Sequence, residues 1–430
     1  MTAEVVILNR MAVALAADSA ASLGEDAEKV YYTNKLFGLS KSSFCPVGIM
    51  IYESPDHLMT PLDTIIKLFR EHTNGRPEAT VRRYAEKFIA FCRNKRFLNK
   101  SAETAFVRNV SVILLERLRK QVEDVMVEEI ERTGALPTRS KETILLDVIV
   151  DRLSKYRGAK PVKSLTGISV GKVARAYRAE TDKAIQQEFP DFKLSKNLRN
   201  QAQKLAASFL LYDESDINTG VVIAGFGERE IFPHLINLKI DGAVCGKLKY
   251  WVVQEAKIDA VRNTSAIYPF AQHEMVERFV EGVDSDYLSW IDSTARKVFF
   301  GFAEELAKIA IRNARAQKAF LKQLPKIVET TISELSKSSA KFRWQEFIRP
   351  VLDAVDVLPK EELANMAEAL VSLTSTKRRV SREKETVGGP VDVAVISKGD
   401  GFVWIKRKQY FKADLNPQFA ARFGVQKEVR

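Results

Sequence analysis

Short apolar runs separated by turn-forming residues occupy residues 1–75, which is the pattern of β-strands joined by hairpins. We expect four strands in two hairpins and then one helix, at 3–8, 11–17, 35–40, 47–53 and 61–71. The first turn falls at Asn9-Arg10, and Pro61 suits the first turn of the helix. This order of strands and helix predicts the first half of a four-layer αββα sandwich.

Residues 76–210 change to a helical pattern. Apolar side chains recur there every three or four residues, at Val107, Val110, Leu114, Leu118, Val122 and Val125 and again at Leu145, Val148, Ile149 and Leu153. A further helix is expected over 194–211. These stripes predict a helical insertion with a core of its own; a partner-binding surface is the alternative interpretation.

The strand pattern returns in residues 211–430. We expect strands at 219–227, 233–240 and 244–253, and Asp241-Gly242 is a typical hairpin turn between the last two. Helices are expected after Pro269, over 295–314 and over 358–373. Two closing strands follow Gly388-Gly389, at 390–396 and 401–405. The chain is therefore divided into 1–75 and 211–430 as the two halves of one core, with 76–210 inserted between them.

Composition narrows the function classes without naming one. The three cysteines (Cys45, Cys92 and Cys245) form no Cys-x-x-Cys pair, so neither a disulfide framework nor a zinc site is expected, and a cytoplasmic location fits best. None of the four histidines has metal-ligand spacing, and each is expected to be a surface or capping residue. No apolar run is long enough to span a membrane. We expect no metal and no cofactor.

The net charge of +12 makes nucleic acid a possible partner. The cations are spread over the chain, however, and the segment 404–412, which interleaves aromatics and lysines, is more typical of an edge strand. A solvated basic surface is therefore the favoured interpretation, and nucleic-acid binding is the alternative.

Thr2 is the residue with the clearest potential chemistry. A threonine hydroxyl is a weak nucleophile alone, but a free α-amine on the same residue can accept its proton. Removal of Met1, which a small second residue such as threonine permits, would create both groups in one residue. The α-amine has a pKa of about 7.7–8.0, which suits a base near neutral pH. The alternative is an ordinary threonine at the start of a strand.

The segment from Thr2 to Asp18-Ser19 resembles the opening of proteasome β-subunits and their bacterial relatives, which are N-terminal nucleophile hydrolases. In that family a mature N-terminal threonine begins a strand, a second strand ends in Ala-Asp-Ser, and a lysine and a glycine follow on the next strands. Asp18, Lys35 and Gly48 stand at the matching positions. The strand pattern near 219–227 and the Gly388-Gly389 strand also resemble the family, so the resemblance covers both ends of the chain.

The resemblance implies a role for each of these residues. Lys35 would lower the pKa of the Thr2 hydroxyl, Asp18 would hold the Lys35 ammonium, and the Gly48 N–H would stabilise an oxyanion. Lys29 is the alternative lysine, and a simple strand-edge lysine is the alternative role for Lys35. The implied function is hydrolysis of a peptide or amide bond, by an enzyme that self-associates.

One stretch departs from the family pattern. The family carries an Asp and a Ser before the late Gly-Gly, whereas this chain has Arg382-Glu383-Lys384-Glu385-Thr386-Val387. Those family residues support the terminal amine, so their replacement favours a second hypothesis. In that hypothesis the protein is a catalytically inactive scaffold or binding protein on the same fold.

Overall fold

The computed structural model describes residues 2–23, 29–39, 46–74, 76–135, 139–190, 192, 194–215, 217–381, 387–409, 411 and 415–418. The chain forms two compact units. Unit 1 comprises Met1–Leu36, Ile258–Ser397 and Val403–Arg430, and unit 2 comprises Phe37–Lys257 and Lys398–Phe402. Both units are mixed α and β with antiparallel sheets, in agreement with the α+β class expected from the sequence.

The main sheet of unit 1 has the strand order β12-β1-β2-β13-β14. Its strands are β1 (Ala3–Asn9), β2 (Ala12–Ala17), β12 (Ser265–Ala271), β13 (Asp392–Ser397) and β14 (Gly401–Lys406). The antiparallel register places Glu4 opposite Ala17 of β2 and opposite Phe270 of β12. A separate two-stranded ribbon is formed by β3 (Ala20–Leu23) and β4 (Lys29–Tyr32).

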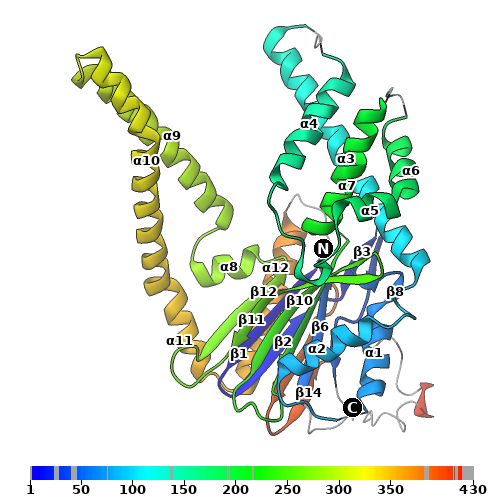
Figure 1. The fold of residues 1–430 in the computed structure, drawn as a ribbon. Helices are drawn as coiled ribbons and strands as arrows, with labels where there is room; N and C mark the ends of the chain where they lie inside the picture. Colours follow the sequence, from blue (N-terminus) through cyan, green and yellow to red (C-terminus); the bar gives the residue numbers. More distant parts are fainter. Residues whose placement is uncertain are drawn as a thin grey trace. The chain divides into compact units, whose positions relative to one another are not determined.

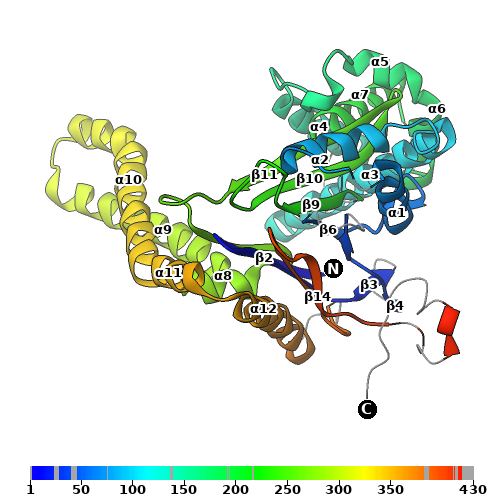
Figure 2. The same cartoon turned by 90° about the horizontal axis from the view of Figure 1, so that it is seen from below.

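Helices pack on one face of this sheet. They are α8 (Glu274–Glu281), α11 (Arg349–Val357) and α12 (Lys360–Val380) (Figure 2). Alternate residues of a strand point to opposite faces, and Ala3, Val5 and Ile7 of β1 join the core that includes Leu363 and Leu370 of α12. Residues of the opposite face, such as Val6 and Leu8, are equally buried. Both faces of β1 are therefore covered.

The longest helices of unit 1 form a hairpin that extends away from the sheet of that unit (Figure 1). They are α9 (Ser285–Ala310) and α10 (Ala314–Arg343), and α10 continues through a π-helical turn, Trp344–Ile348, into α11. Phe300 and Ala303 of α9 pack against Leu324, Val328 and Ile332 of α10.

Unit 2 contains a second sheet with the order β11-β10-β9-β6-β5. Its strands are β5 (Leu36–Gly38), β6 (Val47–Glu53), β9 (Thr219–Gly225), β10 (His234–Val244) and β11 (Lys247–Lys257), and β7 (Asp56–His57) pairs separately with β8 (Thr60–Pro61). Two helices, α1 (Leu62–Thr73) and α2 (Val81–Cys92), pack their apolar faces on alternate residues of β6, β9 and β10.

The remaining helices of unit 2 fall in the range expected to be helical. They are α3 (Lys100–Thr133), α4 (Lys141–Lys155), α5 (Val170–Ala176), α6 (Arg178–Glu188) and α7 (Lys196–Tyr212), with a short 3₁₀ turn at Lys163–Leu165. The stripes of α3 and α4 form a shared core with α6 and α7, in which Leu118, Leu145 and Leu205 are buried. A second cluster joins α3 to the end of β10.

Most of the expected elements are confirmed within one to three residues at the N-terminal strands, α1 and the closing strands, but one turn is wrong. Asp241-Gly242 is not a turn, because β10 runs through it to Val244 and the turn lies at Cys245-Gly246, both with positive φ. Gly242 instead marks an irregularity in the ladder with β11. A Cβ there would lie 2.6 Å from the Phe106 ring, so glycine is needed for packing.

A second expectation is wrong at Pro269. The helix after it begins only at Glu274, and Pro269 itself lies within β12, which the sequence did not predict. Because β12 is an edge strand, a proline that donates no hydrogen bond is tolerated there. The β3–β4 ribbon was also not predicted. Among the described helices, none is long and apolar enough to cross a membrane.

Candidate active site

The structure brings three of the four predicted site residues together in unit 1. Thr2 precedes β1, Asp18 follows β2, and Lys35 precedes β5. The pairing of β1 with β2 brings the start of one strand beside the end of the other, and the Asp18 N–H donates to the Ala3 carbonyl at 3.0 Å. The Thr2 carbonyl in turn accepts from the Gln272 N–H at 3.1 Å.

The Asp18 carboxylate is buried, and both of its oxygens accept hydrogen bonds. Its Oδ1 accepts from the Ala3 N–H at 3.1 Å and its Oδ2 from the Gly388 N–H at 2.9 Å. The Lys35 ammonium forms an ion pair with the same carboxylate. Two backbone donors and one cation offset the cost of burying this charge, so Asp18 is held in one position.

Glu4 is the site residue that the sequence analysis missed. Its side chain is 0% exposed, and its Oε1 lies 3.2 Å from the Lys35 Nζ. Its Oε2 accepts a hydrogen bond from the Thr2 hydroxyl at 3.1 Å. The available signal was one carboxylate in the apolar run of β1, two residues after Thr2 and hence on the same face of the strand. The lysine therefore lies between two carboxylates, one of which contacts the candidate nucleophile.

The electrostatics of Glu4 differ from those of a surface glutamate. Burial raises its pKa from 4.5 to about 8, Lys35 acts in the opposite direction, and the neighbouring Asp18 adds to the increase. Burial disfavours the charged form because the carboxylate loses its hydration. Glu4 therefore keeps its proton to a much higher pH than a surface glutamate does.

The loop around Gly388 closes the site on the other side of Asp18. The Gly388 carbonyl accepts hydrogen bonds from the Ser19 and Ala20 N–H groups at 3.3 and 3.1 Å. Gly389 has a φ of 76°, and a Cβ there would lie 2.3 Å from the Tyr32 ring. The positive φ favours glycine, and a larger residue would also have to displace the Tyr32 ring. Of the stretch 382–387, where the chain departs from the family pattern, Val387 belongs to the described residues and is buried, whereas 382–386 and Met1 lie outside them.

Gly48 is not among the residues brought together in unit 1. It belongs to β6 of unit 2, where it pairs with Ala224 of β9 in the middle of the sheet. Lys29, the alternative lysine, begins β4, and its side chain lies outside the described part of the chain. The geometry of unit 1 thus supports Thr2, Asp18 and Lys35 as one cluster and leaves Gly48 as a prediction.

The cluster combines a hydroxyl, an ammonium and two carboxylates, which are groups that can take part in proton transfer and nucleophilic attack. The Lys35 ammonium occupies the space between the two carboxylates, so these residues are not arranged to hold a metal ion. Within the described ranges, no group of three or more His, Cys, Asp or Glu residues could hold a metal. Unit 2 has a hollow of about 560 Å³ beside α3 and α6 and one of about 620 Å³ beside α1 and α2, and neither is lined by any of these four residues.

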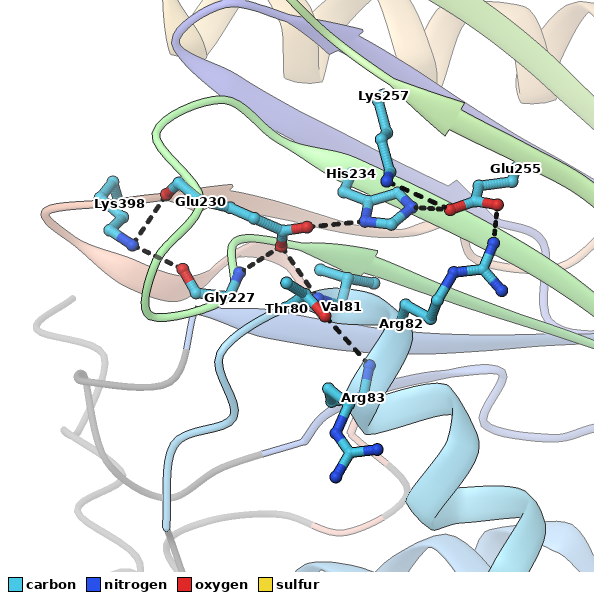
Figure 3. A network of polar contacts seen from close by, with 10 residues as sticks. All are labelled: Thr80, Val81, Arg82, Arg83, Gly227, Glu230, His234, Glu255, Lys257 and Lys398. Carbon is cyan, nitrogen blue, oxygen red and sulfur yellow. Dashed lines mark hydrogen bonds and ion pairs between the residues drawn. The ribbon is translucent and has the colours of Figure 1, made fainter.

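A second polar network lies in unit 2 and involves His234 (Figure 3). The imidazole is 2% exposed, with Nδ1 2.8 Å from Glu230 and Nε2 2.9 Å from Glu255. Glu255 also pairs with Arg82 at the start of α2. The expectation that every histidine is a surface or capping residue is therefore wrong for His234, and also for His57, which is 3% exposed.

The role of this network is structural. Glu230 accepts from the Val81 and Gly227 N–H groups at 2.9 and 2.8 Å, and these bonds together with His234 lower its pKa although burial acts to raise it. Lys398 donates to the carbonyls of Gly227 and Glu230 (Figure 3) and also to that of Glu228. The network fastens the loop between β9 and β10 to the start of α2.

Comparison with known proteins gives only weak structural likeness. No family model matches the chain, and no curated protein matches it. Among solved structures, the chain aligns with Anbu (ancestral beta-subunit) from Yersinia bercovieri over 100% of both chains, with a TM-score of 0.30 and 9% sequence identity. A likeness at that level carries no inference about activity.

Proposed function

We propose that this protein is a threonine hydrolase that cleaves a peptide or amide bond with Thr2 as the nucleophile. The observation that supports the proposal is the buried chain of contacts from the Thr2 hydroxyl through Glu4 and Lys35 to Asp18. Four polar side chains in contact, each at most 4% exposed, are costly to bury and are typical of reactive sites. A site of this kind activates a hydroxyl that is otherwise a poor nucleophile.

In the proposed reaction, Met1 is removed and the Thr2 hydroxyl attacks the substrate carbonyl. The freed α-amine is one candidate acceptor for the hydroxyl proton. The Lys35 ammonium favours the developing alkoxide by Coulomb attraction, and Asp18 keeps the ammonium in place. Gly48 remains the proposed donor to the oxyanion. No cofactor takes part in this scheme.

We also propose that the fold is a four-layer αββα sandwich with residues 76–210 inserted into a core formed by 1–75 and 211–430. Each main sheet has helices on one face, while residues of the other face, such as Leu8 in unit 1 and Met50 in unit 2, are 0% exposed. Apolar sheet faces of this kind pack together in sandwiches. The shared core of α3, α4, α6 and α7 supports the insertion as a semi-independent part.

Self-association and a cytoplasmic location complete the proposal. The face of α9 turned away from α10 exposes Ile291, Val298, Phe302 and Ile309, with 62% and 65% of Val298 and Phe302 accessible. These four positions are symmetric about residue 300, so an antiparallel second copy of α9 would set Ile291 opposite Ile309 and Val298 opposite Phe302. A large unpaired apolar stripe is characteristic of an interaction surface. Nucleic acid is not favoured as the partner of these four apolar side chains.

A second candidate function is a catalytically inactive scaffold. The observation that favours it is the burial of Thr2, which is only 4% exposed and leaves little of its surface for a substrate. In this interpretation the Glu4–Lys35–Asp18 cluster only holds the strand ends together.

The experiment that separates the two functions is acylation of Thr2 by a β-lactone, which esterifies a hydroxyl, followed by intact mass and peptide mapping. The hydrolase proposal expects one adduct at Thr2, lost in Thr2→Val and retained in the matched control Thr60→Val, which lies in β8 of unit 2. Equal labelling of wild type and Thr2→Val, or none of either, would favour the scaffold.

A further inference from the structure

We propose that the Glu4 carboxylate, and not only a terminal amine, accepts the proton of the Thr2 hydroxyl. This inference rests on the proposed hydrolase function and adds a catalytic residue to it. Its basis is geometric: a hydroxyl has one proton to donate, and in this structure the Thr2 Oγ1 donates it to Glu4 Oε2 at 3.1 Å. That separation is within the reach required of a general base.

The backbone fixes this geometry. Thr2 and Glu4 are separated by one residue, so their side chains lie on the same face of an extended chain. Both neighbours of β1 hold it in register, β2 with Glu4 opposite Ala17 and β12 with Glu4 opposite Phe270. The carboxylate has no solvent-exposed surface, and its other oxygen lies against Lys35. Glu4 is therefore directed at the hydroxyl by the sheet itself.

The charges around Glu4 suit a base that works near neutral pH. The groups that face it are Thr2, Lys35 and Asp18. On the far side of the Thr2 carbonyl, the Gln272 side chain accepts a hydrogen bond from Arg378, which pairs with Glu274. Burial raises the Glu4 pKa to about 8, so its ionised form is a much stronger base than a surface carboxylate. Lys35 offsets the negative charge that Glu4 carries before it takes the proton.

The reaction balances without an additional reactant. Glu4 Oε2 takes the hydroxyl proton as Thr2 Oγ1 bonds to the carbonyl carbon, and the carbonyl π electrons move to oxygen. When the tetrahedral intermediate collapses, the C–N bond breaks and Glu4 returns the proton to the leaving nitrogen. A water molecule then repeats the sequence on the ester, giving a carboxylic acid and free Thr2. Met1 removal is not required for any of these steps.

The test uses the full chain in two forms, processed at Thr2 and with Met1 retained by inhibiting methionine aminopeptidase during expression. Each form is treated with the β-lactone over pH 6–9, and the acylation rate is read by intact mass. We expect both forms to react and Glu4→Gln to slow both by about 10²–10⁴-fold, the usual contribution of a general base. The matched control is Glu103→Gln, another buried glutamate, which accepts from Gly246 N–H in unit 2.

The outcomes separate the inference from the function beneath it. If the processed form reacts, the Met1-bearing form does not, and Glu4→Gln reacts as fast as wild type, the α-amine is the base and Glu4 is not. If no form is labelled at Thr2, the hydrolase function itself fails. The pH profile adds a second readout, since a rate increase centred near pH 8 that persists in Glu4→Gln would also assign the base to the amine. Because the Met1 comparison needs no substitution, it stands even if Glu4→Gln does not fold.

Discussion

Replacing Lys35 with methionine removes the cation from between two buried carboxylates. Lys35 is 4% exposed, and the side chains of Asp18 and Glu4 are 0% exposed, so water cannot take over the role of the ammonium. Asp18 keeps its two backbone donors, Ala3 and Gly388. Once Lys35 is replaced, Glu4 keeps only the Thr2 hydroxyl as a donor among the contacts described above. The loss should therefore fall mainly on Glu4 when Glu4 is charged.

The size of the effect depends on pH in a defined direction. The pKa of Glu4 is raised in the folded state, from 4.5 to about 8, so its contribution to stability is complete below pH 4.5 and is lost as the pH rises through 8. At pH 5 Glu4 is protonated in both proteins, and Lys35→Met loses only the pair with Asp18. Lys35 lowers the pKa of Glu4, so at pH 9 the variant either holds Glu4 protonated or leaves two carboxylates without a cation, and either state costs free energy relative to the wild type. Breaking a buried pair costs about 3–5 kcal/mol, and we expect the lower figure at pH 5 and the upper one at pH 9.

Urea unfolding followed by circular dichroism at pH 5, 7 and 9 measures these free energies. Lys67→Met is the control, because that lysine is 54% exposed and its pair with Asp63 on α1 is worth less than about 1 kcal/mol. Adding Glu4→Gln to Lys35→Met should recover part of the loss at pH 9 and little at pH 5. A loss that is the same at every pH, or no larger than that of Lys67→Met, would show that Lys35 does not balance Glu4.

Three further predictions test other parts of the structure. Gly389→Ala should destabilise the protein by about 1–3 kcal/mol in urea unfolding, because its φ of 76° and the Tyr32 ring exclude a side chain; an unchanged midpoint would refute this. Lys249→Met should cost about 3–5 kcal/mol by the same assay, since the ammonium lies 2.6 Å from Asp241 and both side chains are at most 1% exposed; a stabilised protein would mean that the pair is dispensable. Phe302→Asp should reduce the oligomer measured by light scattering while changing stability by no more than about 0.5 kcal/mol, because Phe302 is 65% exposed; an unaltered molar mass would remove α9 as the self-association surface.

The sequence predicted those elements whose signal is local. Examples are the strand pair 3–8 and 11–17, the helix after Pro61 and the stripe of α3. Each of them is recognised from the spacing of apolar residues within its own segment. The turn at Asp241-Gly242 was wrong because a favourable turn sequence was overridden by tertiary packing, in which the Phe106 ring lies over Gly242. The strand β12 was missed because it contains Pro269, which reads as a break and is tolerated only at a sheet edge.

The candidate site was predicted in part for a similar reason. Asp18 and Lys35 stood at family-like positions, and their ion pair is present in the structure. Glu4 was not predicted, because a single glutamate in an apolar strand reads equally well as a strand-edge residue. The environment of Glu4 is set by the pairing of β1 with a strand on each side and by Lys35, which lies 31 positions later in the chain. No pattern within β1 contains that information.

The burial of Glu4 is difficult to explain as a structural device alone. Asp18 already joins the ends of β1 and β2 through the Ala3 N–H, and the Gly388 N–H and the Lys35 ammonium are its further partners. A valine at position 4 would fit the apolar strand without the desolvation that raises the Glu4 pKa. A fold optimised for stability has no use for a carboxylate that is easily protonated and lies 3.1 Å from a hydroxyl. Such local conflicts between residue and environment are expected at functional sites, and this one lies on the atom proposed to react.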